Sequence, residues 1–216
     1  MNLKLQLEIP SIFRVIFDSE ALGKYERVFS TLVKVRLLVH ELERLWMARS
    51  RLSNDRLFCH LRHSMHFFIS NLLYYLQVDV IDSEFCLLND HMATASNFQD
   101  VLMAHRNFLS SILRLSLVDN LTVQEGMERI FHVCLRFIAV CRLLHQQEDI
   151  VIGKTKNEKT LPPIVIPHEE IEAIRKDFFS QISYLFAIMR KVESKGFMFR
   201  LDFNSYLSNI VADIKL

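Results

Sequence analysis

The chain has 216 residues, of which half are apolar, and only four are glycine and four are proline. This scarcity of helix-breaking residues favours long helices joined by short loops, and the length fits one large domain or two small ones. The 26 basic and 25 acidic side chains give a net charge of +1, which argues against nucleic-acid binding because proteins that bind phosphates present a basic excess.

Mean hydropathy is +0.17, which is high for a soluble monomer and fits either a well-filled core or an apolar surface reserved for a partner. The most hydrophobic window, residues 67–80, is interrupted by polar residues and is shorter than the ~20 residues that a membrane span requires. We therefore expect no membrane insertion. The cysteines are widely spaced in apolar surroundings, and we expect reduced, buried thiols in an intracellular protein. They are Cys59, Cys86, Cys134 and Cys141.

The N-terminal segment predicts a short strand at residues 3–9, because leucine and isoleucine alternate there with polar residues up to Pro10. A single strand cannot satisfy its own backbone groups, so its partner is expected in a longer parent protein. The first helix is expected to begin after Asp18 or Ser19, both good N-caps. Its expected core stripe follows alternating spacings of four and three residues. The stripe is Val28, Leu32, Val35, Val39, Leu42 and Trp46.

The second helix is expected to start after an Asn54-Asp55 cap and to run from about residue 56 to about residue 92, with a possible kink at 78–80, where β-branched residues cluster. Its core stripe is Leu57, Leu61, Met65, Phe68, Leu72, Leu76 and Val80. A third helix is expected near Ser96, a capping hydroxyl with Gln99 three residues on, and a fourth at the capping box Thr122–Glu125. Their stripes are Phe98, Leu102, His105, Leu109, Ile112 and Leu115, then Met127, Phe131, Cys134, Ile138, Cys141 and Leu144.

Residues 149–167 break the helical rhythm and predict a long loop. A fifth helix is expected from His168 to a C-cap at Gly196, followed by one short helix after Asp202. Its stripe is Ile171, Ile174, Phe178, Ile182, Leu185, Met189 and Val192. The expected fold is therefore all-α, an antiparallel bundle of about five long helices with a short N-terminal strand and a short C-terminal helix.

The catalytic and metal-binding patterns in the sequence are all incomplete, which favours a protein without a catalytic or metal site. His60, His63 and His66 sweep about 120° of a helix, and no acidic or cysteine ligand completes a zinc set. Gly153-Lys154-Thr155 copies the end of a phosphate-binding loop, but the required earlier glycine is Glu148. The carboxylates form no clustered metal-binding array and are explained as solvated or helix-end charges. They are Asp18, Asp79, Asp82, Glu84 and Asp90. We expect no enzyme, no metal and no cofactor.

Residues 71–85 read NLLYYLQVDVIDSEF and resemble the NLQYYLQVDVLESQF signature of γ-tubulin complex proteins, most closely the component 4 type. Residues 104–109, AHRNFL, resemble the family's AHDHFL helix, and residues 200–206, RLDFNSY, resemble its closing RLDYNKYY. The likeness runs from about residue 3 to about residue 207. It implies that residues 1–216 are the γ-tubulin-binding C-terminal domain of a longer protein whose N-terminal half is absent.

The resemblance implies a non-catalytic scaffold that binds γ-tubulin and helps present it as a template for microtubule nucleation. It also implies association with other γ-tubulin complex proteins through the absent N-terminal half. The implied location is the cytoplasm and cytoskeleton, at a microtubule-organising centre such as the centrosome or spindle pole. Any GTP chemistry would then belong to tubulin.

The group Arg200, Asp202, Asn204 and Tyr206 is our candidate partner-binding site. The same group fits a structural role equally well, with Asp202 as an N-cap and Tyr206 filling the core. Two other functions stay open from composition alone, a generic helical protein–protein adaptor and a helical metal-dependent enzyme. The likeness of residues 71–85 favours the γ-tubulin scaffold over both.

Overall fold

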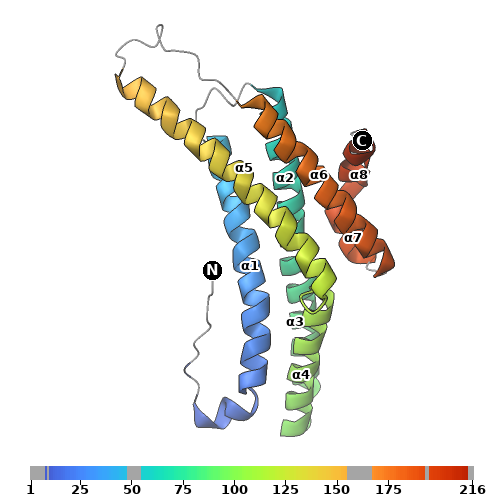
Figure 1. Ribbon diagram of the computed structural model, residues 1–216. Helices are drawn as coiled ribbons and strands as arrows, with labels where there is room; N and C mark the ends of the chain where they lie inside the picture. Colours follow the sequence, from blue (N-terminus) through green and yellow to red (C-terminus); the bar gives the residue numbers. More distant parts are fainter. Residues whose placement is uncertain (1–7, 9, 48–54, 155–166, 193–194, 214–216) are drawn as a thin grey trace. The chain divides into compact units, whose positions relative to one another are not determined.

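The computed structural model describes residues 8, 10–47, 55–154, 167–192 and 195–213 (Figure 1). Over these residues the chain is all-α and contains no β-strand, which confirms the predicted fold class. The strand predicted at 3–9 lies outside the described residues except for Glu8, which belongs to no regular element. The first element is a 3-10 helix, η1 (Ser11–Val15).

The chain divides into two compact units. Unit 1 comprises Met1–Arg36 and Asn71–Glu125, and unit 2 comprises Leu37–Ser70 and Gly126–Leu216. The division falls within α1 (Ser19–Met47), at the end of α2 (Arg56–Tyr74) and within α5 (Leu121–Lys154).

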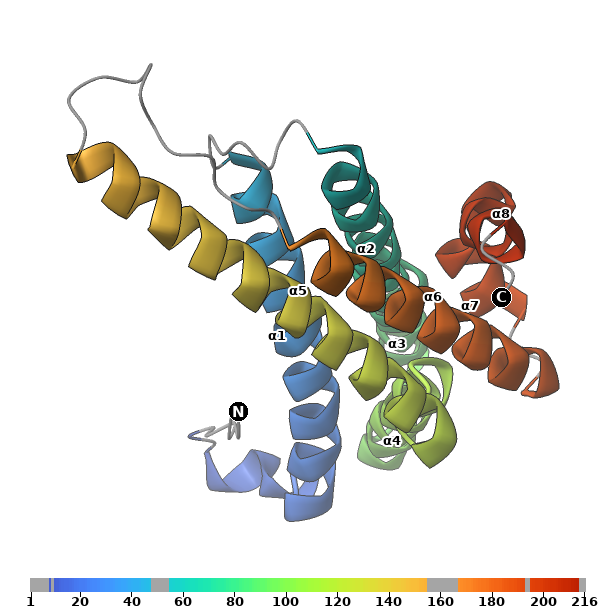
Figure 2. The same ribbon diagram turned by 45° about the horizontal axis from the view of Figure 1, so that its top comes forward.

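Unit 1 is built around a helical hairpin. Helices α3 (Ser83–Thr94) and α4 (Phe98–Leu115) are joined by three residues and lie side by side in both views (Figures 1 and 2). The cap of α4 is Asn97, whose side chain accepts from the Asp100 backbone N–H at 3.0 Å, while Asp100 accepts from the Ser96 backbone N–H at 3.0 Å. The predicted cap, Ser96, is therefore wrong by one residue, because the Asn97–Asp100 pair forms the reciprocal bonds instead.

The predicted second helix is a continuous helical run with a change of type in its middle. Helix α2 passes into a π-helical segment, η3 (Tyr75–Asp82), and then into α3. The buried residues Leu72, Leu76 and Val80 are four apart, a spacing that drifts around a 3.6-residue helix. The i→i+5 bonds of a π-helix widen each turn and keep such residues on one face. A π-helix thus stands where the sequence suggested a kink.

Unit 2 is built around α2. Helix α6 (His168–Lys191) lies between α5 and the last helix, α8 (Tyr206–Asp213), in both views (Figures 1 and 2). Aromatic rings of α2 contact rings of α5 and α6. The ring centroids of Phe58 and Phe137 of α5 are 5.3 Å apart, and those of Phe68 and Phe178 of α6 are 6.5 Å apart. Aromatic burial of this kind dominates core energetics.

Helix ends show where local sequence rules succeed and fail. Asp18 and Asp55 cap α1 and α2, accepting from backbone N–H groups at 2.7 and 2.8 Å, as predicted. Helix α5, however, is capped by Asn120, which accepts from the Val123 backbone N–H at 3.1 Å. The predicted Thr122 capping box is wrong, because Asn120 already satisfies the first turn.

Two further predictions near the C-terminal half are wrong. Helix α5 continues to Lys154, so the start of the loop predicted at 149–167 is helical; residues 155–166 lie outside the described residues. Helix α6 ends at Lys191, and Gly196 lies inside an additional short helix, α7 (Lys195–Leu201). No described glycine has a positive φ, so Gly196 does not make the left-handed C-cap that was expected.

The predicted core stripes are largely buried. Those of α5 and of α6 up to Met189 are buried at every predicted position. Trp46 is the main exception, because its side chain is 64 % exposed, and Phe98 and Val192 are also exposed. Among the helices of the described residues, we find none with the length and apolar character to cross a membrane.

Candidate partner-binding surfaces

The predicted C-terminal group lies at the junction of α7 and α8 in unit 2. Arg200 is in the last turn of α7. Asp202 precedes a short 3-10 turn, η5 (Phe203–Ser205), Asn204 lies in the middle of that turn, and Tyr206 begins α8. The structure therefore places all four residues around one turn.

Asp202 organises this turn. Its Oδ1 accepts from the backbone N–H groups of Leu207 and Ser208 at 2.9 and 3.1 Å, and its Oδ2 accepts from the Ser208 hydroxyl. These bonds satisfy donors that the first turn of α8 leaves unpaired. Asn204 and Ser205 both have φ of 56°, a left-handed conformation that Asn tolerates better than most residues. Asp202 thus acts as a helix cap.

Tyr206 attaches the turn to α2. Its ring lies 4.7 Å from that of Phe67 and 5.9 Å from that of His63, and its hydroxyl is 3.4 Å from the Ser64 hydroxyl. The sequence left a structural and a binding role equally open for this group. The contacts of Asp202 and Tyr206 show a structural role for both, and Asn204 is the exposed member of the four.

The same turn exposes two aromatic residues that sequence reasoning missed. Phe199 is 69 % exposed and Phe203 is 45 % exposed, with ring centroids 6.1 Å apart. The sequence feature that could have indicated them is the FxFRLDF run at residues 197–203, in which phenylalanines lie on both sides of Arg200 and Asp202. Exposed aromatic side chains of this kind are enriched at protein interfaces.

The 71–85 stretch is in large part structural. Tyr75 is buried, and its hydroxyl donates to the Leu115 carbonyl oxygen at 2.9 Å. This bond ties the π-helical segment to the end of α4 within unit 1. The neighbouring Tyr74 is 49 % exposed and Phe85 is 51 % exposed. The stretch therefore has one buried face and one face available to a partner.

The α3–α4 hairpin carries the second candidate surface, which we call the hairpin face. Its five large apolar side chains are each 45–54 % exposed. They are Phe85, Leu87, Met92, Phe98 and Met103. Phe85 also meets Phe108 of α4 edge to face, at 6.4 Å between centroids. Large apolar side chains left exposed on two adjacent helices make the hairpin a candidate interaction element.

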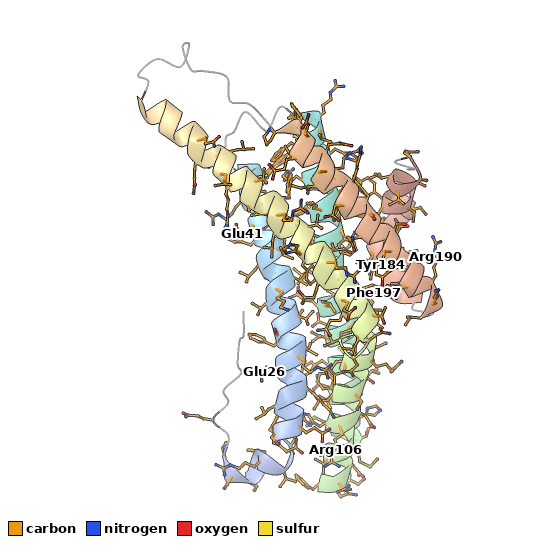
Figure 3. All side chains as sticks on the ribbon, in the orientation of Figure 1. Glu26, Glu41, Arg106, Tyr184, Arg190 and Phe197 are labelled. Atoms are coloured by element: carbon orange, nitrogen blue, oxygen red, sulfur yellow. The ribbon has the colours of Figure 1, made fainter. Side chains whose placement is uncertain are left out.

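The chain from η3 to the first half of α4 carries acidic residues and no lysine or arginine. The sequence has no lysine or arginine between Arg62 and Arg106; Arg106 is labelled on α4 in Figure 3. Five acidic residues fall in that interval: Asp79, Asp82, Glu84, Asp90 and Asp100. The absence of basic residues was available from the sequence and was the signal that could have located this surface. Its chemistry suits a partner with apolar and basic side chains.

His60, His63 and His66 follow α2 as separate side chains. The His60 ring lies 6.4 Å from the Phe179 ring, His63 meets Tyr206 edge to face, and His66 lies 3.7 Å from the Glu43 carboxylate. In the part of the chain that the structure describes, no three His, Cys, Asp or Glu side chains are grouped to hold a metal ion. Gly153 and Lys154 end a helix, and Thr155 lies outside the described residues.

All four cysteines are free thiols. Cys134 and Cys141 are buried, and burial raises the pKa of Cys141 to about 12. The prediction of buried thiols is wrong for Cys86, which is exposed, and Cys59 is half-buried. Buried thiols with raised pKa values are unreactive, so Cys134 and Cys141 serve as core side chains.

Comparison with known proteins identifies the family of the chain. Residues 2–207 match the family described as gamma tubulin complex component C-terminal. The chain belongs to the gamma-tubulin complex component family. This match confirms the resemblance of residues 71–85 and 200–206.

Individual members of the family are similar to this chain over almost its whole length. The chain is 29 % identical to gamma-tubulin complex component 4 of Homo sapiens, over 94 % of the chain and 30 % of the relative. It is 26 % identical to component 4 of Arabidopsis thaliana, over 94 % of the chain and 29 % of the relative. Component 3 of Arabidopsis thaliana is 23 % identical, over 97 % of the chain and 30 % of the relative. The chain thus spans less than a third of the length of these relatives.

Proposed function

We propose that this chain binds γ-tubulin and helps present it as a template for microtubule nucleation. The observation that carries the proposal is the family match over residues 2–207. The printed names of the relatives identify them as components of gamma-tubulin complexes. On this proposal the chain acts at a microtubule-organising centre as a scaffold, without a catalytic step of its own.

A scaffold promotes nucleation by ordering its partners in advance. Bringing several γ-tubulin molecules together costs translational and rotational entropy for each one. If a protein binds γ-tubulin and also assembles with others of its family, this entropy is lost during assembly, before nucleation begins. We propose that these 216 residues supply the γ-tubulin contact, and that assembly with other family members uses a different part of a longer protein.

We further propose that the hairpin face and the exposed part of the C-terminal turn are the contact surfaces. The hairpin face combines exposed apolar side chains with an excess of acidic residues, which suits a partner surface with basic and apolar side chains. The C-terminal turn adds Phe199, Phe203 and Asn204, which are exposed. Arg200 joins them from the last turn of α7, while Asp202 and Tyr206 hold the turn in shape.

Co-elution on a sizing column tests the proposal. The 25.5 kDa chain should shift to an earlier volume with purified γ-tubulin at micromolar concentration of each. The double variant Leu87→Ser/Phe98→Ser tests the hairpin face, and Asn204→Gly, which keeps the left-handed conformation, tests the turn. A matched control is Leu143→Ser on α5, because Leu143 is 61 % exposed and lies in neither surface. Elution of two separate peaks with the unmodified chain would refute γ-tubulin binding, whereas binding unchanged by the hairpin and turn variants would refute only the surfaces.

A further inference from the structure

A cavity of about 540 Å³ lies in unit 2, between the end of α1 and the middle of α2. It is lined by Glu43, Trp46, Arg62, His63 and His66. Its volume falls in the range of small-molecule sites, about 300–1,000 Å³. Four of its five lining side chains are cationic, aromatic or able to donate an N–H.

Arg62 is the feature of this cavity that needs an explanation. Its side chain is only 8 % exposed, and arginine is almost never buried to this degree unless it is paired. No carboxylate of the described residues lies within ion-pair distance of it. Among the residues that the structure describes, its close ring contact is with Trp46, whose centroid lies 4.1 Å from the guanidinium carbon. A cation–π contact supplies part of the energy that a buried charge lacks, but it uses the face of the guanidinium and leaves the in-plane N–H donors available to another partner.

The described surroundings of Arg62 offer little compensation for its charge. Burial lowers the pKa of Arg62, and the group that acts in the opposite direction is the thiol of Cys59. The one acidic side chain of the cavity, Glu43, lies 3.7 Å from His66. Arginine keeps its proton under all physiological conditions. Over the described residues, this permanently charged group therefore faces an open cavity without a carboxylate paired to it.

We propose that this cavity binds an oxyanion, the phosphate or carboxylate group of a ligand or of another protein. The guanidinium of Arg62 offers a planar fork of N–H donors that fits both oxyanions. Trp46 holds the fork from one side, and His63 and His66 offer further N–H donors at the rim. Glu43 opposes the anion and limits its affinity. This site is independent of the proposed γ-tubulin contact, and nothing in it requires that partner.

Trp46 is the only tryptophan of the chain, so its fluorescence reports on this cavity alone. Inorganic phosphate and, separately, acetate are titrated into the full 216-residue chain, with sodium chloride at matched ionic strength as the reference. We expect a saturable change with at least one oxyanion, at a Kd on the order of millimolar for so small a ligand. The two arms distinguish a phosphate site from a carboxylate site. An equal response to chloride and to both oxyanions would overturn the proposal.

Substitutions at the cavity test whether the fluorescence change arises from anion binding at Arg62. Arg62→Lys keeps the charge but loses the fork, and we expect binding to weaken roughly ten-fold; Arg62→Met should abolish the saturable change. Glu43→Gln removes the opposing charge and should tighten binding. The control is Arg136→Lys, because Arg136 is half-exposed and pairs with Asp177 at 2.9 Å outside the cavity. If the Arg62 variants fail to fold, Glu43→Gln decides: unchanged affinity in a folded Glu43→Gln chain would overturn the proposal.

Discussion

The bond between the Tyr75 hydroxyl and the Leu115 carbonyl makes a sharp prediction about the 71–85 stretch. Leu115 is the last residue of α4, so its carbonyl has no acceptor role inside the helix. The Tyr75 hydroxyl donates to it at 2.9 Å from the first residue of the π-helical segment. Tyr75→Phe removes this one oxygen and keeps the ring, whose side chain is only 6 % exposed.

The expected cost follows from what the substitution leaves behind. A typical intramolecular hydrogen bond contributes about 0.5–1.5 kcal/mol, and a carbonyl left without a partner adds a desolvation penalty, which together give about 1–3 kcal/mol. In a chain of this size each kcal/mol lowers Tm by roughly 2–4 °C. We therefore expect Tyr75→Phe to lower Tm by about 4–8 °C at the middle of that range.

Urea unfolding followed by far-UV circular dichroism measures this cost. The control is Tyr184→Phe, because Tyr184 is 42 % exposed and phenylalanine keeps the ring that lies 5.4 Å from the Arg129 guanidinium. We expect a lower midpoint for Tyr75→Phe at an unchanged m-value, and a change within about 0.5 kcal/mol for Tyr184→Phe. Equal costs for the two tyrosines, or no cost for Tyr75→Phe, would refute the assignment of Tyr75 as the residue that fixes the π-helical segment.

Three further predictions concern the pH response, a helix cap and the core. Burial lowers the pKa of His105, whose Nε2 lies 3.0 Å from the Tyr25 hydroxyl. His105 is therefore protonated more readily in the unfolded chain than in the folded chain, so the stability of the fold should decrease as pH drops below about 6.5. Thermal melts from pH 8 to pH 5 should show a smaller decrease in Tm for His105→Gln than for the original chain. An equal decrease in Tm would contradict this role of His105. Asp202→Ala should cost about 1 kcal/mol of unfolding free energy, against no measurable cost for the exposed Asp213→Ala in the same helix; equal urea midpoints would exclude the cap. Phe178→Ala, at a fully buried position, should cost about 3–5 kcal/mol, and a calorimetric Tm within about 3 °C of the original would contradict its place in the core.

The sequence predicts best where one side chain acts on its own helix. Asp18 and Asp55 were predicted as caps because an aspartate before an apolar periodic run satisfies the first backbone N–H groups. The spacing of Leu61, Met65 and Phe68 likewise determines a buried face without knowledge of the partner helix. These local rules yield the all-α class and the approximate bounds of the long helices.

The sequence predicts poorly where competing candidates stand close together or where the partner is distant. Asn120 and Thr122 are both good caps two residues apart, and periodicity does not choose between them. Trp46 continues the core spacing of α1, yet it is exposed and meets Arg62 of α2. Its position depends on a contact sixteen residues away that local periodicity does not encode. The candidate site shows the same limit, because the roles of Asp202 and Tyr206 became clear only from Ser208 and Phe67.

The central claim is that this chain binds γ-tubulin, and sedimentation velocity with the two purified proteins tests it most directly. At roughly 10 µM of each, well above a micromolar Kd, the account predicts one faster boundary that contains one chain and one γ-tubulin. Two boundaries at the positions of the separate proteins would contradict it.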